Sequence, residues 1–164
     1  LAQMLLVRPT SGGQLVFAGL LLCLLVVLWL RAADLLYALF FGMLPFPGFD
    51  HILVQLLTTP RGWALILTGS AIGGLFAAFA MAISLFSIPM LLERRVDALT
   101  ALGTSFAITT QNLRSVLPWG VIVTLGFALS AATGLLGLIV IFPLLGHGTW
   151  HAWVALRPEG AQRQ

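Results

Sequence analysis

Residues 63–90 read WALILTGSAIGGLFAAFAMAISLFSIPM and contain no Lys, Arg, Asp or Glu. A helix needs roughly 20 apolar residues to cross the hydrocarbon of a bilayer, so this segment is long enough to do so. Two further uncharged runs, at 14–30 and 116–156, are also long enough or nearly so. These runs predict an integral membrane protein whose spans are helices.

The composition excludes a water-soluble domain. Of the 164 residues, 60% are hydrophobic and only 8% are charged, whereas a soluble domain carries about 25% charged residues. The eight basic residues are all arginines. They are scattered and do not form the basic stripe of a nucleic-acid-binding protein. We therefore expect the lipid bilayer to surround the chain, and no nucleic acid as a partner; other membrane subunits as partners are what the family resemblance described below implies.

Proline and glycine residues divide the apolar runs within a single domain, 1–164. The breaks lie around Pro45–Gly48 and at Pro89, because proline cannot continue a helix. Asp50 is expected to cap a short helix that follows the first break. The run from 116 would measure about 60 Å as one helix, twice the hydrocarbon thickness, so it must form a hairpin. The predicted transmembrane helices are 14–41, 63–89, 116–131 and 134–156.

Residues 92–114 follow a different pattern. Apolar residues recur there every three or four positions, with charged and hydroxyl residues on the other faces. This pattern predicts an amphipathic helix in the membrane interface. This helix either packs beneath the transmembrane helices of its own chain or binds a partner protein. The fold class is thus all-α, a polytopic bundle of about four transmembrane helices with one interfacial helix.

Arginine positions predict the orientation. Most arginines fall on one side of the four-span arrangement, and the positive-inside rule places that side in the cytoplasm. The helix at 92–114 and the C-terminus are therefore predicted to be cytoplasmic.

Two edges of small residues are predicted to pack closely against neighbouring helices. Small residues at four-residue spacing let membrane helices approach one another. The residues concerned are Gly69, Gly73 and Ala77 on one helix, and Gly126, Ser130 and Gly134 on another.

Arg31 and Asp34 interrupt the first apolar run. Their i, i+3 spacing places both on one helix face, where they can form an ion pair. The pair either lies at the membrane interface or forms part of a charged relay inside the membrane.

His147 and His151 share a helix face because they are four residues apart. They are candidates for hydrogen bonds to neighbouring helices or headgroups, for metal or haem binding, or for proton transfer. A zinc site needs three or four ligands, and no Cys, Asp or Glu lies nearby in the sequence. We predict no metal ligand, no bound cofactor and no catalytic residue, and hence that the protein is not an enzyme.

Two stretches carry a family resemblance: SIPMLLERRVDA at Ser87–Ala98, followed by Thr104-Ser105, and PLLGHGTWH at Pro143–His151. Together they resemble the Domain of Unknown Function 2189 family of bacterial inner-membrane proteins, over the chain from about Gln14 onward. Members usually carry a further N-terminal helical hairpin, and a chain that begins with Leu1 is expected to lack it. Some members are described as cytochrome c oxidases, but this chain lacks the histidines that the catalytic subunit would need.

The resemblance implies a bacterial inner-membrane protein that serves as an accessory or assembly subunit of a respiratory, cytochrome oxidase-type complex. One alternative is a small transporter or channel. Another is a haem- or metal-binding membrane protein that uses His147 and His151.

Overall fold

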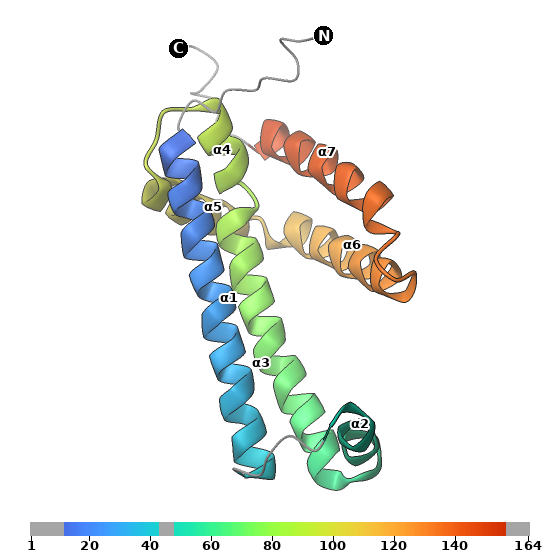
Figure 1. The fold of residues 1–164 in the computed structure, drawn as a ribbon. Coiled ribbons are helices and arrows are strands. Elements are labelled where there is room, and N and C mark those ends of the chain that lie inside the picture. Colours follow the sequence, from blue (N-terminus) through green and yellow to red (C-terminus); the bar gives the residue numbers. More distant parts are fainter. Residues whose placement is uncertain (1–11, 43–47, 157–164) are drawn as a thin grey trace. The chain divides into compact units, whose positions relative to one another are not determined.

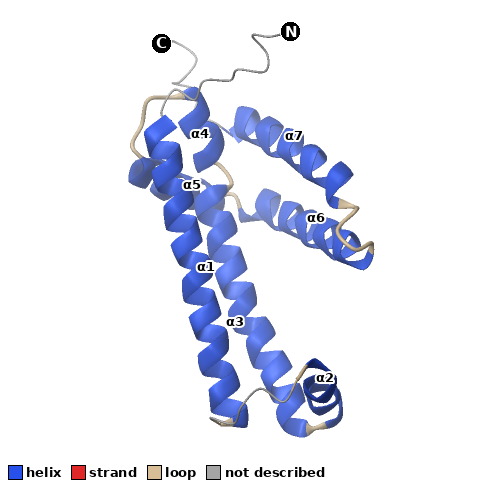
Figure 2. Ribbon diagram, viewed as in Figure 1, coloured by secondary structure: helices blue, strands red, loops and turns tan. Residues whose placement is uncertain are grey.

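The computed structural model describes residues 12–42 and 48–156, which fold into seven helices and no strand (Figures 1 and 2). The predicted all-α fold class is confirmed. The helices are α1 Gly12–Phe41, α2 Phe49–Thr58, α3 Pro60–Ser84, α4 Ser87–Glu93, α5 Ala98–Gln111, α6 Leu113–Ala132 and α7 Leu138–Leu156.

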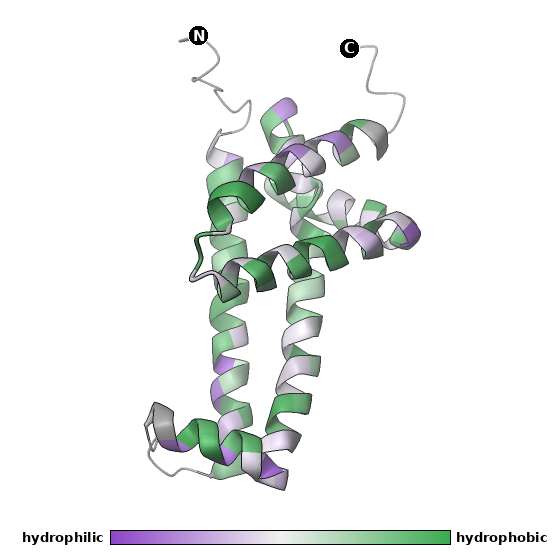
Figure 3. Cartoon of the chain, turned by 90° about the vertical axis from the view of Figure 1, so that its right-hand side faces the viewer, coloured by the Kyte–Doolittle hydropathy of each residue, from purple (hydrophilic) through white to green (hydrophobic). Residues whose placement is uncertain are grey.

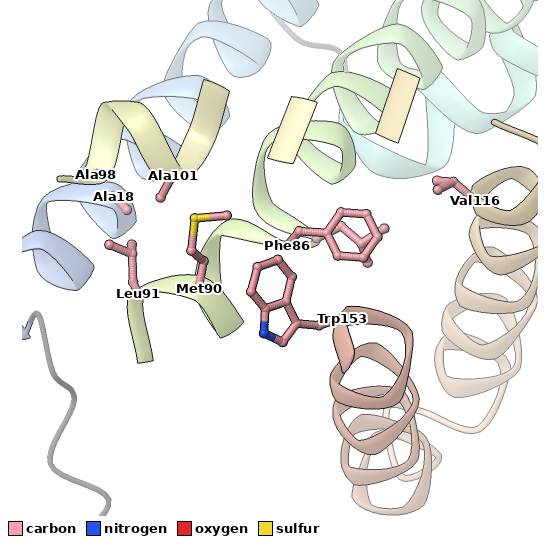
Figure 4. Packing of buried hydrophobic residues seen from close by; sticks show 9 residues of the cluster. Ala18, Phe86, Met90, Leu91, Ala98, Ala101, Val116 and Trp153 are labelled. Carbon is pink, nitrogen blue, oxygen red and sulfur yellow. The ribbon is translucent and has the colours of Figure 1, made fainter. Parts of the chain in front are cut away.

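The helices belong to two compact units. Of the described residues, the first unit comprises 12–19 and 81–156, and so contains the start of α1, the end of α3 and all of α4–α7. The second unit comprises 20–42 and 48–80, with the rest of α1, all of α2 and most of α3. In the first unit, buried side chains from several helices gather around α4, as Figure 4 shows.

Three stretches of the described chain are long and apolar enough to cross a membrane: α1, residues 60–93 and α6. The apolar helix at 138–154 is shorter, so the count of four spans stays a prediction. Hydrophobic residues predominate along the helices in Figure 3. Many are exposed on the protein, including Leu20, Leu75 and Leu125. In a membrane protein such side chains are the lipid-facing surface.

The transmembrane helix predicted at 63–89 is interrupted earlier than the sequence indicated. A boundary was expected at Pro89, but α3 ends at Ser84 and Leu85–Phe86 form a turn before α4. The proline ring clashes with the carbonyl four residues before it, so its effect falls one turn upstream. Pro89 itself is buried inside α4.

The predicted continuous helix over 92–114 is wrong. α4 ends at Glu93, and Arg94 has extended backbone angles, φ −124° and ψ 155°. α5 covers only 98–111, and Leu113 already belongs to α6. Asn112 is the C-cap of α5 and also the N-cap of α6. Asp97 and Asn112 separate the helices because such residues favour capping over helix interiors.

Two other boundaries differ in detail. Gly48, with φ 94°, stands at the N-cap of α2 in place of Asp50. The turn between α6 and α7 lies at 133–137, slightly later than expected. Gly134 and Leu135 both have positive φ there, 63° and 71°, and glycine adopts such angles without strain.

Close glycine contacts hold α6 against α7. A Cβ atom at Gly126 would lie 2.9 Å from Cγ2 of Ile141, and one at Gly148 would overlap the ring of Trp119. At the turn, a Cβ at Gly137 would lie 2.9 Å from Cα of Ser130. The missing side chains let the two helices approach along their length.

We predict that Gly148→Ala lowers the free energy of unfolding by about 1–3 kcal/mol, the usual cost of overpacking. Gly146→Ala is the matched control on the same helix, because its Cβ would meet nothing. That control should be neutral or slightly stabilising. Thermal unfolding in mild detergent, followed by circular dichroism, measures both. Equal stability of the two variants would contradict a close contact between Trp119 and Gly148.

Candidate functional site

The break between α3 and α4 is closed by a side chain from α5. In an unbroken helix, the N–H of Phe86 would donate to the carbonyl of Ala82. Here it donates to Oγ of Ser105 at 3.0 Å, and that hydroxyl donates to the carbonyl oxygen of Ala82 at 2.8 Å. Ser105 thus inserts into the helical hydrogen-bond ladder, one of the recognised causes of a sharp kink.

Thr109 supports the same junction. Its hydroxyl donates to the carbonyl of Ala82 at 3.3 Å, so this oxygen accepts two side-chain hydrogen bonds. Phe86 and Ser105 have no exposed surface, and Thr109 is 5% exposed. The N–H of Phe86 and the carbonyl of Ala82, both freed by the break, are therefore satisfied away from solvent, as buried polar groups need to be.

The inward face of α5 consists mainly of small or hydroxyl-bearing residues. The residues buried there are Ala98, Ala101, Leu102, Ser105 and Thr109. Small side chains let a helix backbone approach its neighbour closely. This closeness allows the short side chain of Ser105 to reach the backbone of α3.

The start of α5 is held by two different side chains. Asp97 Oδ2 accepts a hydrogen bond from the backbone N–H of Thr100 at 2.8 Å, and Oε1 of Gln14 accepts one from Ala98 at 2.9 Å. These bonds satisfy two N–H groups that a helix N-terminus leaves without partners. The bond from the N–H of Ala98 to Gln14 also ties the start of α1 to α5.

Trp153 anchors α7 to α4. Its side chain is fully buried, and its indole N–H donates to Oε2 of Glu93 at 2.7 Å. The guanidinium carbon of Arg94 lies 5.7 Å from the ring centroid, and the ring of Phe86 lies 6.4 Å away. A charged acceptor and a cation over the indole make this a strong, oriented contact. Figure 4 shows Trp153 beside Phe86 and Met90.

Arg31 and Asp34 form the ion pair that their spacing predicted. The guanidinium and carboxylate atoms lie 3.3 Å apart, and the two side chains are 72% and 67% exposed. The pair lies on α1 in the second unit.

The two predicted histidines lie exposed on α7. Nδ1 of His147 is 2.9 Å from the carbonyl oxygen of Pro143, to which it donates in the Nδ1-protonated tautomer. Within the described residues, no three His, Cys, Asp or Glu side chains gather closely enough to hold a metal ion.

The small residues predicted to form packing edges have different surroundings. A Cβ at Gly73 would lie 3.2 Å from Nε1 of Trp29, whereas one at Gly69 would meet nothing, and Ala77 is exposed. On α6, Gly126 faces Ile141, as described above. Ser130 is fully buried and donates to the carbonyl of Gly126 at 2.8 Å. Gly134 lies in the turn, where its φ of 63° gives it a conformational role.

A family model described as "Predicted integral membrane protein (DUF2189)" matches residues 1–93. The chain belongs to the DUF2189 family. The match differs from the expected extent, because it begins before Gln14 and ends at Glu93, so Pro143–His151 lies outside it. This DUF2189 protein is an integral membrane protein. No curated protein and no solved structure matches it.

The matched region of this DUF2189 protein contains α1–α4, but not all of the residues that hold α4 in place. Ser105 and Trp153 lie beyond the match. In the sequence, Ser105 stood out only as part of a stretch of family resemblance. No pattern indicated that either residue contacts α4, because each acts on a segment far away in the chain. Pro89 did signal a break, but no local pattern identifies which hydroxyl closes it.

We predict that Ser105→Ala lowers the free energy of unfolding by about 1–3 kcal/mol, since the N–H of Phe86 loses its buried acceptor. Hydrogen exchange of a peptide containing Phe86 should become faster. Thr110→Ala is the control, because the Thr110 hydroxyl bonds only to carbonyls of its own helix turn. Unchanged stability and exchange in Ser105→Ala would exclude the inserted hydroxyl as a structural element.

The Asp97 cap should make stability depend on pH. The hydrogen bonds from Thr100, the backbone one foremost, lower the pKa of Asp97. Because the pKa of Asp97 is lower in the folded state than in the unfolded state, the ionised carboxylate stabilises the fold. This contribution to the free energy of unfolding is complete at pH values above the ordinary pKa of an aspartate. It is lost as the pH falls through the lowered value.

We therefore expect thermal stability in detergent to fall on acidification below about pH 4. Asp97→Asn keeps a capping side chain that cannot titrate, so its stability should change less over the same interval. If thermal stability depends on pH in the same way in wild type and Asp97→Asn, the titration of Asp97 does not contribute to the stability of the fold.

Proposed function

We propose that this protein is a non-catalytic accessory or assembly subunit of a larger membrane complex, and that this complex is a respiratory, cytochrome oxidase-type assembly. The arrangement of α5 is the observation that supports a docking role. Apart from Leu102, the residues that this helix buries are small or hydroxyl-bearing, and its outward side carries an open glycine position between two exposed apolar side chains.

We define the docking face as Leu99, Gly103 and Phe106, which lie on one side of α5 at i, i+4 and i+7. Leu99 is 64% exposed, and a Cβ atom at Gly103 would meet nothing. A leucine knob beside a glycine notch suits a closely packed transmembrane helix of another subunit. Phe106, 42% exposed, extends the same side.

The inward contacts of α5 support this role by holding the docking face in one orientation. Ser105 is bonded to the α3–α4 junction, Asp97 caps the helix and Gln14 bonds to its first residue. A surface ordered before binding loses less conformational entropy when a partner docks. α5 therefore has the rigidity expected of an assembly surface.

The respiratory assignment rests on the family resemblance, since some DUF2189 members are described as cytochrome c oxidases. We place the chain in the bacterial inner membrane. Arg94, Arg95 and Arg114 flank α5, and the positive-inside rule assigns this helix and the C-terminus to the cytoplasmic side.

Purification of the tagged full-length protein in mild detergent tests the proposal. Mass spectrometry and a visible spectrum on the same sample should reveal oxidase subunits and haem absorbance. Gly103→Leu should abolish this copurification by filling the notch. Gly146→Leu is the control, because its Cβ also meets nothing.

Each part of the proposal can fail separately. A wild-type protein that purifies alone and colourless would overturn the respiratory role. Copurification with non-respiratory membrane subunits would retain the accessory role but reject the oxidase assignment. Retention of partners by Gly103→Leu would show that α5 is not the docking surface.

A further inference from the structure

An apolar groove lies between α1 and α3 in the second unit, where the two helices run side by side (Figure 1). Its volume is about 390 Å³. Its walls include Ala33 and Leu36 on α1 and Leu65, Ile66 and Gly69 on α3. A Cβ at Gly69 would meet nothing, so the groove exists because small residues leave the space between the helices unfilled.

The two ends of the groove differ in chemistry. At one end the indole of Trp29 crosses towards α3, where its Nε1 lies 3.2 Å from the Cβ position of Gly73. At the other end is Leu65, and Arg61 lies one helical turn earlier on the same face of α3. Arg61 is exposed. The groove therefore has an aromatic end and a cationic end.

Trp63 marks the cationic end as the headgroup level. Its indole N–H donates to the carbonyl of Leu57 at 3.1 Å, and its side chain is 51% exposed at the corner between α2 and α3. Tryptophan is enriched where hydrocarbon meets headgroups. From this corner the α3 wall of the groove continues into an uncharged sequence, while α1 carries the exposed Arg31–Asp34 pair outside the groove lining.

The groove has the length and lining of a site for a hydrocarbon chain. Its lining residues on α1 run from Trp29 to Tyr37, a length of about 12 Å. Apolar walls along this length, around a volume of about 390 Å³, can hold part of one acyl chain.

We infer that the groove binds one acyl chain of a phospholipid whose phosphate lies at Arg61. The apolar walls match the chain, and the guanidinium matches the phosphate, for which arginine is well suited. The site is independent of the docking face on α5, so either can fail without the other.

Native mass spectrometry of the full-length protein tests this inference. The protein is delipidated in detergent and then titrated with dioleoyl phosphatidylglycerol. We expect wild type to retain one lipid. Gly69→Leu should lose it, because the new side chain fills the groove. Gly74→Leu, the control on the same helix, should retain it, since a Cβ at Gly74 meets nothing and Gly74 does not line the groove. Arg61→Gln should weaken retention.

Fluorescence supplies a second readout inside the groove. The emission assigned to Trp29, taken as the difference between wild type and Trp29→Phe, should be quenched by brominated acyl chains. Gly69→Leu should remove this quenching. If Gly69→Leu does not fold, as judged by circular dichroism and gel filtration, Ala33→Leu fills the groove from the opposite wall.

Equal lipid retention by the Gly69→Leu and Gly74→Leu variants would overturn the inference. So would quenching of Trp29 that persists when the groove is filled. Retention that is unchanged in Arg61→Gln would reject the position assigned to the phosphate.

Discussion

The hydroxyl group of Ser105, set between the N–H of Phe86 and the carbonyl of Ala82, is the contact on which the first unit depends. A helix that contains Pro89 cannot keep its hydrogen-bond ladder unbroken one turn upstream. Within an apolar layer, each backbone group left without a partner costs several kcal/mol. One serine satisfies a donor and an acceptor together, so α3 can break and α4 can turn into the packed interior.

The remaining contacts of this unit follow from that requirement. Because Ser105 must reach the backbone of α3, α5 has to approach closely, and Ala98 and Ala101 on its inward face permit this. Once α4 is placed by the break, Phe86 and Glu93 provide the surface on which Trp153 packs and forms its hydrogen bond. The C-terminal helix is thus positioned by a kink that lies far earlier in the chain.

The parts of this fold that sequence could predict are those governed by local spacing. Long uncharged runs indicated the helices, and the i, i+3 spacing of Arg31 and Asp34 indicated their ion pair. The prediction of one continuous helix over 92–114 was wrong because the apolar periodicity continues across two capping residues, Asp97 and Asn112. The preference of these residues for helix ends is the stronger local signal. The contact between Glu93 and Trp153, 60 residues apart, has no local signature.

The surroundings of its glycines distinguish positions that pack inside this protein from positions that are open on its surface. Exposed leucines say little in a chain surrounded by lipid, because lipid-facing positions are apolar everywhere. A Cβ at Gly126 or Gly148 would meet another side chain of the same protein, so those glycines serve the fold. At Gly69 and Gly103 a Cβ would meet nothing, yet one residue lines a groove and the other lies beside an exposed leucine. Space of this kind next to apolar walls loses dispersion contacts unless something fills it. A lipid chain at Gly69 and a neighbouring helix at Gly103 would restore those contacts.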